Sequence, residues 1–396
     1  MEKLSRIGAR PVGSRANRLA ADYFLDILSV NGFKISKQEF DCIDWEPGKA
    51  YAGAGRDYVN LLPSPYSLAV NASSKLICIS SLEKLYKSEA REKILLLCGD
   101  ICREQLMPKN YPFYNPLSHK EIIRVLEEKG PAAIIAVTSK NPEMAGALYP
   151  FPLFEDGDFN IPSAYVSDKE GEALFRLAGK DIELAIESKR IPSKAANIVG
   201  RKNGGRKRIV LSAHIDTKEG TPGALDNGTG ITVLAILANM LKDSNLPLSI
   251  EIAALNGEDY YLPGGHLMYL EGIKKDKACI LAAINIDGAG YRKGGSTYSL
   301  FNFRKDESAE IENVFLNKHG FREVRNWYQG DHMIFAQNKV KAVAITSEES
   351  EHIMAQIAHT PKDNMDNVDV AKLVWIASAL KDIIYLYADK KAGEMP

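Results

Sequence analysis

Residues Leu211 to Asp226 read LSAHIDTKEGTPGALD, and this stretch decides how the rest of the chain is interpreted. Its apolar start predicts a buried strand that runs out at His214 and Asp216. A loop rich in Gly and Pro follows, and Asp226 then precedes an apolar run of helical length that begins at Thr229. Because open α/β sheets place their chemistry at the carboxyl ends of strands, the stretch predicts a site with one imidazole and two carboxylates.

Strand and helix patterns alternate from Ala195 onward. Strands are expected at Ile209–Ala213, Ser249–Leu255, Ile280–Ile286 and Ala342–Thr346. Helices are expected at Thr229–Lys242, Gly264–Gly272, Ser308–His319 and Val370–Tyr387. This alternation predicts an α/β fold with a mixed, mostly parallel central sheet covered by helices on both faces.

Two regions precede this pattern. Ser14 is expected to cap a helix that ends near Val30, and Phe33 to Phe40 alternates like a strand. The stretch from Asp41 to Pro65 is rich in turn residues, which indicates a crossing into another unit. Residues 50–192 then combine short predicted strands with long irregular stretches and show no convergent set of ligand-type side chains. We therefore expect a β-rich domain at 50–192, inserted into a catalytic domain formed by 1–49 and 193–396.

The bulk composition excludes several classes of protein. The 396 residues carry a formal net charge of −1, so no overall field draws the chain to nucleic acid or to a membrane surface. The basic run from Arg201 to Arg208 is interpreted as a solvated hairpin turn. No apolar stretch suits a signal peptide or a membrane span, which favours a cytoplasmic location. The alternative that a leader segment has been removed stays open. The sequence does not indicate an oligomeric state.

The five cysteines are few and their number is odd, which argues against a disulfide framework. Cys78, Cys98 and Cys279 lie in apolar runs and are expected to be buried thiols. Cys98 and Cys102 are close enough in sequence to pair, but nothing requires it.

Histidine and acidic residues follow the predicted strands in a regular way. His214 and Asp216 share one face of an extended chain, so Asp216 can orient the imidazole toward a metal ion. A core histidine beside a surface acid is the alternative. Asp226 can bridge two cations with its two oxygens, or it can simply cap the following helix.

Three more positions extend this series. Glu258 and Asp259 end the apolar strand Ile250 to Leu255, where one acid can bind metal and the other can carry protons, unless both are solvated in a turn. Asp287 ends another apolar run, and His359 lies in a loop before the last helix. Each signal is weak alone, but their repetition within one α/β domain predicts a site for two divalent cations.

These residues resemble the M28 family of zinc aminopeptidases. The matching segments are HID at His214, ALDNGTG around Asp226, GED at Glu258, NID ending at Asp287 and HTPKDNMDNVD beginning at His359. The N-terminal IGARPVGSRANRLAADYFLDILSVNGF is similar to the leading helix of that family, and Asp331-His332 with Phe335 is similar to its DHxxF segment. GPAAIIAVTS and FNIPSAYVSDKEGEALF resemble a protease-associated domain, so the resemblance implies that 50–192 is such a module.

The resemblance implies a role for each matching residue. The metal ligands would be His214, Asp226, Asp259, Asp287 and His359, holding two Zn²⁺ ions with Asp226 as the bridge. Asp216 would orient His214, and Glu258 would be the general base for attack of water on a peptide substrate. Tyr328 and His332 are candidates for stabilising the oxyanion, with aromatic packing as the alternative for Tyr328.

One residue departs from the family pattern. Asp259 stands where the family usually has a glutamate, so Co²⁺ or Mn²⁺ stays open beside zinc.

Three rival interpretations remain. Two-zinc carboxypeptidases, dipeptidases and deacylases of the M20 group have a similar ligand order, but their extra domain lies later in the chain. Glutaminyl cyclases share the scaffold, generally with one zinc and without the insertion. A non-catalytic, receptor-like relative should have lost ligands, whereas this chain has a suitable residue at all five ligand positions and a glutamate at the base.

Overall fold

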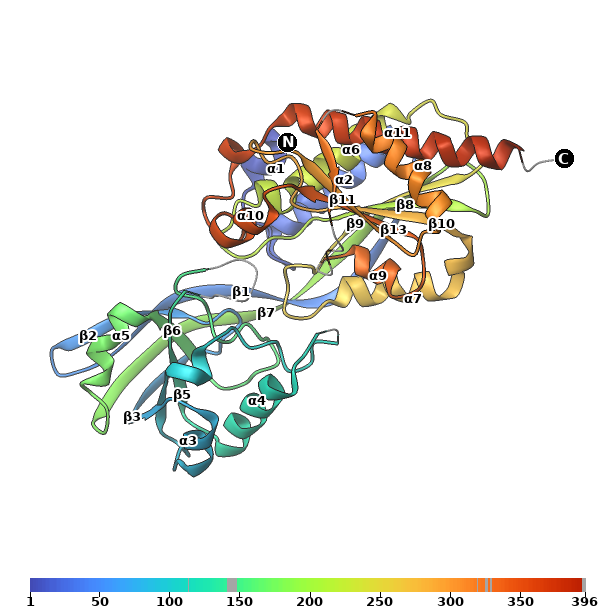
Figure 1. Cartoon of the computed structure of the whole chain (residues 1–396). Coiled ribbons are helices and arrows are strands. Elements are labelled where there is room, and N and C mark those ends of the chain that lie inside the picture. The colour runs from blue at the N-terminus through green and yellow to red at the C-terminus, as the bar shows by residue number, and fades with distance from the viewer. Residues whose placement is uncertain (113, 141–147, 319, 325–326, 328–329, 394–396) are drawn as a thin grey trace. The chain divides into compact units, whose positions relative to one another are not determined.

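The computed structural model describes the chain except residues 113, 141–147, 319, 325–326, 328–329 and 394–396. The chain forms two compact units (Figure 1). The first unit consists of Met1–Cys42 and Lys194–Pro396, and the second of Ile43–Ser193. Two long strands, β1 (Lys34–Ala54) and β7 (Asp181–Lys202), contribute residues to both units and pair with each other. The assignment of the second unit to the protease-associated class stays a prediction.

A mixed sheet forms the centre of the first unit. Its strand order is β7-β9-β8-β10-β13-β11-β12. The strands are β8 (Arg208–His214), β9 (Ser249–Leu255), β10 (Ile280–Ile286), β11 (Ser296–Phe301), β12 (Phe321–Glu323) and β13 (Ala342–Ser347). The central strands β9, β8, β10 and β13 are parallel, whereas β7 and β11 join them antiparallel. The predicted fold class, a mostly parallel α/β sheet, is confirmed.

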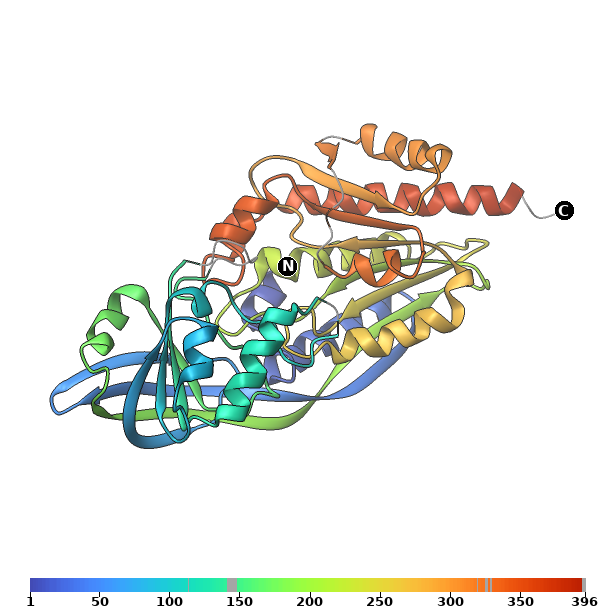
Figure 2. The same cartoon turned by 60° about the horizontal axis from the view of Figure 1, so that its bottom comes forward.

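Helices cover both faces of this sheet (Figure 1). Helices α2 (Arg15–Val30), α6 (Thr229–Met240), α8 (Lys305–Leu316) and α11 (Val370–Gly393) share one apolar core, and α7 (Gly264–Asp276) and α9 (His332–Ala336) share the other. Figure 2 shows α11 beside α8. Successive side chains of a strand alternate between the cores, so Ile209 and Leu211 face one layer and Val210 the other. The parallel strands are therefore mostly apolar, as expected for strands buried on both faces.

The N-terminal segment also packs on this unit. Helix α1 (Glu2–Ile7) precedes α2, and the Ser14 side chain accepts a hydrogen bond from the Asn17 backbone N–H, as a helix cap should. The predicted start and end of α2 are confirmed.

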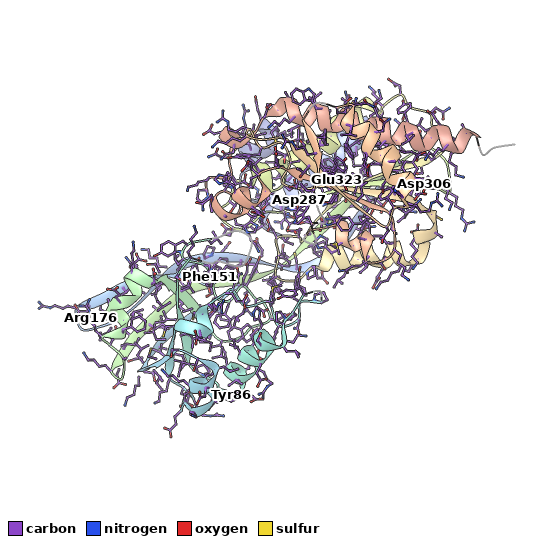
Figure 3. The ribbon with its side chains drawn as sticks, viewed as in Figure 1. Tyr86, Phe151, Arg176, Asp287, Asp306 and Glu323 are labelled. Atoms are coloured by element: carbon purple, nitrogen blue, oxygen red, sulfur yellow. The ribbon has the colours of Figure 1, made fainter. Side chains whose placement is uncertain are left out.

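The strands of the second unit follow the order β1-β2-β6-β5-β4-β3-β7. Its further elements are β2 (Asp57–Pro63), β3 (Val70–Ile79), α3 (Leu82–Lys87), β4 (Ile94–Leu97), the 3₁₀ turn η1 (Gly99–Cys102), α4 (Leu117–Lys129), β5 (Ala133–Thr138), β6 (Ser163–Ser167) and α5 (Asp168–Phe175). One of its apolar clusters contains the fully buried Phe151, whereas Tyr86 at the end of α3 is exposed (Figure 3). The chain does cross into the second unit within residues 41–65, after Cys42. The expected turn-rich character of this stretch is wrong, because β1 continues to Ala54 and β2 follows at once.

The basic run was interpreted as a solvated hairpin turn, and residues 204–207 are indeed exposed. The run from Arg201 to Arg208 does not form a hairpin, since β9 lies between β7 and β8. Arg208 is buried and pairs with Glu251 at 3.0 Å and with both oxygens of Asp276 at 2.8 Å, because strand pairing places Glu251 beside the start of β8.

The cysteines differ from expectation as well. Cys78 is exposed, and Cys98 and Cys279 are only partly buried. The apolar neighbours of Cys78 in sequence do not bury it, because strand residues alternate between faces and its own face is open near the end of β3.

The remaining elements are short. They are the turn η2 (Ala224–Gly228), the 3₁₀ turns η3 (Lys277–Cys279) and η4 (Met365–Asn367), and α10 (Ser350–Gln356). In the part of the chain that the structure describes, no helix has both the length and the apolar content needed to cross a membrane.

Candidate metal centre

The site lies where the central parallel strands end. His214 closes β8, Asp287 follows β10 directly, and the Glu258-Asp259 turn follows β9. Backbone hydrogen bonds continue past the strand ends, from Ile215 N–H to the Leu255 carbonyl at 2.8 Å and from Asp287 N–H to the Ile345 carbonyl at 2.9 Å. Parallel pairing thus aligns these strand ends at one edge, which explains why residues far apart in sequence meet here.

Asp226 lies at the centre of the cluster and contacts two imidazoles through different oxygens. Its Oδ1 is 3.0 Å from His214 Nε2, and its Oδ2 is 3.1 Å from His359 Nε2. His214 Nε2 is also 3.4 Å from Asp287 Oδ1, and His359 Nε2 is 2.9 Å from Asp259 Oδ1. The cluster therefore consists of two groups of one histidine and one acid, joined by the Asp226 carboxylate.

The donor set suits divalent cations. Potential ligand atoms within 4.8 Å of one another occur in the groups His214–Asp226–Asp287 and Asp226–Asp259–His359, and in a third group that joins His214 and Asp259 to Glu258. Among the described residues, Asp259 Oδ2 is buried without a hydrogen-bond partner, and such an atom is costly unless something pairs with it. Imidazole and carboxylate together favour zinc and related ions. The residues present thus fit a metal centre.

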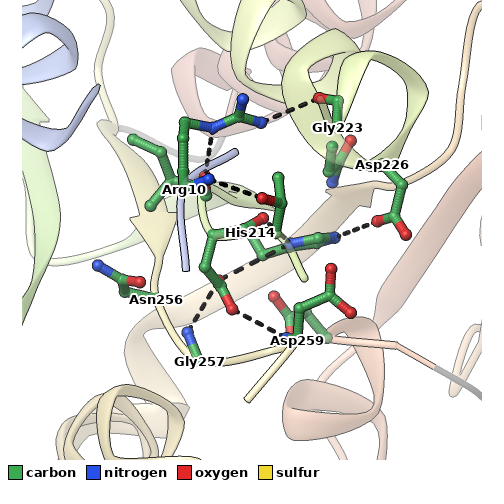
Figure 4. Close-up of polar contacts among 12 residues, drawn as sticks. Arg10, His214, Gly223, Asp226, Asn256, Gly257 and Asp259 are labelled. Carbon is green, nitrogen blue, oxygen red and sulfur yellow. Dashed lines mark hydrogen bonds and ion pairs between the residues drawn. The ribbon is translucent and has the colours of Figure 1, made fainter. Parts of the chain in front are cut away.

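Asp216 is fully buried and supports the turn that carries the candidate base. Its carboxylate accepts hydrogen bonds at 2.9 Å from the backbone N–H groups of Gly257 and Asp259 (Figure 4). His214 Nδ1 lies 3.2 Å from the Asp216 backbone carbonyl and 3.8 Å from its carboxylate. In contrast to the expectation, the carbonyl of Asp216 is the closer partner of the imidazole, because its carboxylate already accepts from this turn.

Buried asparagines hold the same turn from the other side. Asn256 and Asn17 exchange side-chain hydrogen bonds of 2.8 and 3.0 Å, and the Asn256 N–H donates to the Asn197 side chain at 3.0 Å. Gly257 has φ +114°, a backbone conformation that side chains strongly disfavour, so glycine is required between Asn256 and Glu258. These contacts fix the direction in which the chain leaves β9.

Arg10 is a buried residue to which the sequence reasoning assigned no role. Its guanidinium donates to the backbone carbonyls of Ile215 at 3.0 Å and Pro222 at 3.0 Å. It also donates to the carbonyl of Gly223 at 2.9 Å (Figure 4). The backbone N–H of Arg10 donates to Thr217 Oγ1 at 2.8 Å. Arg10 therefore holds the loop between β8 and η2 from within.

Asp363 binds the next part of the same loop. Its two oxygens accept hydrogen bonds from the backbone N–H groups of Leu225 at 2.6 Å and Asp226 at 3.1 Å. The Asn227 side chain then donates to the Ile286 carbonyl at 2.8 Å. The Arg10 guanidinium on the carbonyls and the Asp363 carboxyl group on the amides thus position Asp226 from both sides, and burial raises the pKa of Asp363 to about 7.

Arg10 and Asp363 both occur in the quoted family-like segments. Asp363 lies four residues after His359, a signal that could have drawn attention to it. Nothing in the sequence indicates which backbone groups Arg10 or Asp363 contacts.

The carboxylates dominate the electrostatics of the site. Burial opposes protonation of both imidazoles, yet Asp287 and Asp226 raise the pKa of His214, and Asp259 and Asp226 raise the pKa of His359, well above the ordinary histidine value. Burial, reinforced by the charges of Asp259, Asp287 and Asp331, raises the pKa of Glu258 well above its usual range. This excess of negative charge is what bound cations would neutralise.

Two further residues were candidates for stabilising the oxyanion. Tyr328 lies outside the described residues. His332 is buried, its Nε2 lies 2.6 Å from the Trp327 carbonyl, and its ring packs against Phe301 and Trp327. The sequence reasoning missed the buried pair of His266 Nε2 and Asp331 Oδ1, 2.7 Å apart, because a lone histidine on a helix carries no distinctive signal.

Comparison with known proteins places this site in a family. The model of Peptidase family M28 matches residues 196–384, the range that contains every candidate metal ligand. Aminopeptidase YwaD of Bacillus subtilis is 22% identical over 96% of this chain and 81% of its own length. A probable leucine aminopeptidase 2 of Aspergillus fumigatus is 23% identical over 91% of this chain and 75% of its own.

Solved structures share the fold. BSAP, a zinc aminopeptidase from Bacillus subtilis, superposes with a TM-score of 0.72 at 19% identity and covers 97% of this chain and 93% of its own. An aminopeptidase from Aneurinibacillus sp. strain AM-1 gives a TM-score of 0.71 at 18% identity, covering 96% and 91%. With the family match, these likenesses define the protein as a metallopeptidase. Residues 196–384 match the model of peptidase family M28.

Proposed function

We propose that this protein is a metal-dependent aminopeptidase that removes N-terminal residues from peptides with the help of two zinc ions. The observation that carries the proposal is the Asp226 carboxylate, whose two oxygens face two separate pairs of one histidine and one acid. A bridging carboxylate between two such pairs is the ligand arrangement expected for a centre of two cations.

Each cation has a proposed set of protein ligands. His214 and Asp287 would hold one ion, His359 and Asp259 would hold the other, and Asp226 would be shared. Zinc is favoured because imidazole and carboxylate oxygen are among its usual ligands and because a fold relative is described as a zinc aminopeptidase. The ions would supply Lewis-acid activation of water and of the peptide carbonyl.

Glu258 is the proposed general base. It follows β9 on the turn held by Asp216, and it shares a cluster of ligand atoms with His214 and Asp259. Its raised pKa makes it a stronger base than an exposed glutamate, which suits it to take a proton from the attacking water. The same carboxyl group then returns that proton to the leaving amine.

The aminopeptidase assignment rests on the relatives. YwaD and the fungal relative are both described as aminopeptidases, and their matches extend over most of this chain. The rival M20-type carboxypeptidase or deacylase has no comparable support, since the family match is to M28. A receptor-like relative is disfavoured because all five ligand-type side chains are present and converge.

A substrate panel tests the proposal. The purified protein is given peptides with a free N-terminus, their N-acetylated counterparts and their C-terminal amides, and the products are identified by mass spectrometry. We expect loss of the N-terminal residue from free and amidated peptides, no cleavage of acetylated ones, loss of activity with a chelator and recovery with Zn²⁺, Co²⁺ or Mn²⁺. Cleavage at the C-terminus, or activity that the chelator leaves unchanged, would refute it.

A further inference from the structure

The sulfur atoms of Cys78 and Cys98 are in contact within the second unit. Cys78 lies near the end of β3, and Cys98 directly follows β4. Their Sγ atoms are 3.6 Å apart, and the Cys98 Sγ also lies 3.7 Å from the Ile79 carbonyl. No disulfide joins them, and both are free thiols. The pair belongs to neither the metal centre nor the first unit.

Strand pairing explains why the two sulfurs meet. β3 and β4 are parallel, with Cys78 opposite Leu96, and Cys98 is two residues beyond Leu96. Side chains two residues apart on a strand share a face, so Cys78 and Cys98 point to the same side of the sheet. The Cys98 N–H still donates to the Ile79 carbonyl at 2.9 Å, which keeps the strands together at this point.

The two thiols differ in exposure. Cys78 is exposed, whereas Cys98 is partly buried. Burial and the neighbouring Cys78 thiol raise the pKa of Cys98 to about 12, so Cys98 stays protonated near neutral pH. Reagents in solution therefore meet Cys78 first, and Cys98 is placed to react second.

A cavity of about 400 Å³ lies beside the pair and is lined by Cys98, Cys102, Val137 and Phe175, among others. Cys102 itself is buried, and burial raises its pKa well above the ordinary thiol value. The structure thus places Cys98 against Cys78, although Cys102 is its closer neighbour in sequence.

We propose that Cys78 and Cys98 form a redox-reactive dithiol, in which a hydroperoxide oxidises the exposed sulfur and the second sulfur closes a disulfide between β3 and β4. The Cys78 sulfur attacks the hydroperoxide, the O–O bond breaks, an alcohol or water leaves, and Cys78 becomes a sulfenic acid. The Cys98 sulfur then attacks the Cys78 sulfur, the S–O bond breaks, and hydroxide leaves as water with the Cys98 proton. Two thiols and one hydroperoxide thus give one disulfide, one alcohol or water, and one further water.

The test counts thiols in the full-length protein. The protein is treated with hydrogen peroxide, excess peroxide is removed, and the denatured chain is labelled with an alkylating agent. Because the chain has five cysteines, we expect five labels before oxidation and three afterwards (5 − 2), with a cross-linked peptide pair containing Cys78 and Cys98. A thiol reductant should restore five labels. Five labels after peroxide, or a cross-link of Cys98 to Cys102, would overturn the proposal.

Matched variants separate the two roles. Cys98→Ser removes the second sulfur, so peroxide should leave a sulfenic acid on Cys78 that a dimedone probe captures. Cys78→Ser should retain all four remaining labels after peroxide. Cys279→Ser, which changes a partly buried thiol outside the pair, should still lose two of its four labels. If dimedone marks Cys98 in Cys78→Ser as readily as it marks Cys78 in Cys98→Ser, the assigned order of attack is wrong.

Discussion

At the residue scale, the excess of acids over bases around Asp226 determines how the metal centre should take up its ions. In the absence of a cation, the carboxylates hold protons on His214 and His359, whose pKa values lie well above the ordinary histidine value. Zinc binds the neutral imidazole, so an incoming ion must displace those protons.

Proton release on metal binding is the first prediction. Titration of the chelator-treated protein with Zn²⁺ near neutral pH should release protons, because both protonated imidazoles must lose a proton before they can bind an ion. Calorimetry in buffers of different ionisation enthalpy measures the number released. An observed binding enthalpy that is the same in every buffer would contradict the prediction, and titration of His359→Ala should show fewer protons released.

The second prediction concerns Glu258. Glu258→Gln keeps the size of the side chain but cannot accept a proton, so kcat should fall about 10²- to 10⁴-fold. Metal content, measured by atomic emission, should stay at the wild-type level. Near wild-type turnover in the variant would remove Glu258 from the role of base.

The pH dependence of the wild-type enzyme is the third prediction. A base acts only when ionised, and burial with the surrounding acids raises the pKa of Glu258, so kcat/KM should fall as the pH is lowered from about 8 to about 5. Bound cations would shift this fall in kcat/KM to lower pH, but kcat/KM would still decrease as the pH is lowered. Metal content is measured at each pH, since loss of ions would produce a similar fall. A flat profile with the metals retained would refute the prediction.

At the element scale, the loop between β8 and η2 is held by opposite charges at its two ends. Arg10 binds its carbonyls and Asp363 binds the amides of Leu225 and Asp226. The position of Asp226 therefore depends on residues that would touch neither metal nor substrate.

The fourth prediction tests this loop. Arg10→Met should leave buried carbonyls unpaired and lower the free energy of unfolding of the metal-free protein by about 3 kcal/mol.

Asp363→Asn keeps the shape of the side chain but replaces one acceptor with a donor, so metal affinity should fall about 10- to 100-fold. Denaturant unfolding and metal competition measure the two effects. Lys37→Met, on the exposed part of β1, serves as a control and should change neither. Unchanged metal affinity in Asp363→Asn would show that the loop does not control Asp226.

The sequence predicts the parallel core well, because strands buried on both faces are short, apolar and bounded by turns. The bounds of β9 and β10 match the expected ranges residue for residue. The sequence predicts β1 less well, because the strand expected at Phe33 to Phe40 continues to Ala54, and it does not indicate that β7 extends from Asp181 to Lys202. Both contain Pro and alternate exposed with buried residues, so local pattern cannot distinguish them from loops.

In the candidate site, too, some residues could be predicted from the sequence and others could not. Residues such as His214 and Asp287 could be predicted because they end apolar strands, and the sheet brings all strand ends together. Contacts made through the backbone could not be predicted, since Arg10 and Asp363 recognise peptide groups that every residue carries. The sequence does not indicate that the Asp216 carbonyl lies closer to His214 than its carboxylate does, because the N–H groups of Gly257 and Asp259 that occupy the carboxylate cannot be located from the sequence.

At the scale of the whole molecule, the candidate ligands span His214 to His359, and only the folded chain brings them together. An unfolded chain has no such site, so metal binding should stabilise the native state by mass action. Removal of the ions with a chelator should therefore lower the Tm, and added Zn²⁺ should raise it again in a concentration-dependent way. Asp226→Asn, which weakens both pairs at once, should show a smaller metal-dependent shift. A Tm that is insensitive to chelator would contradict a structural contribution of the ions.

The pairing of β1 with β7 has a consequence for how the gene for such a protein can change. The chain leaves the first unit after Cys42 and returns at Lys194, and the ion pair of Asp41 with Lys194, 3.5 Å long, shows that departure and return are neighbours. An insertion whose two ends lie side by side can be gained, lost or exchanged as a cassette without moving any strand that carries a ligand. Recombination at this boundary could thus vary the accessory unit while the hydrolytic machinery is inherited unchanged.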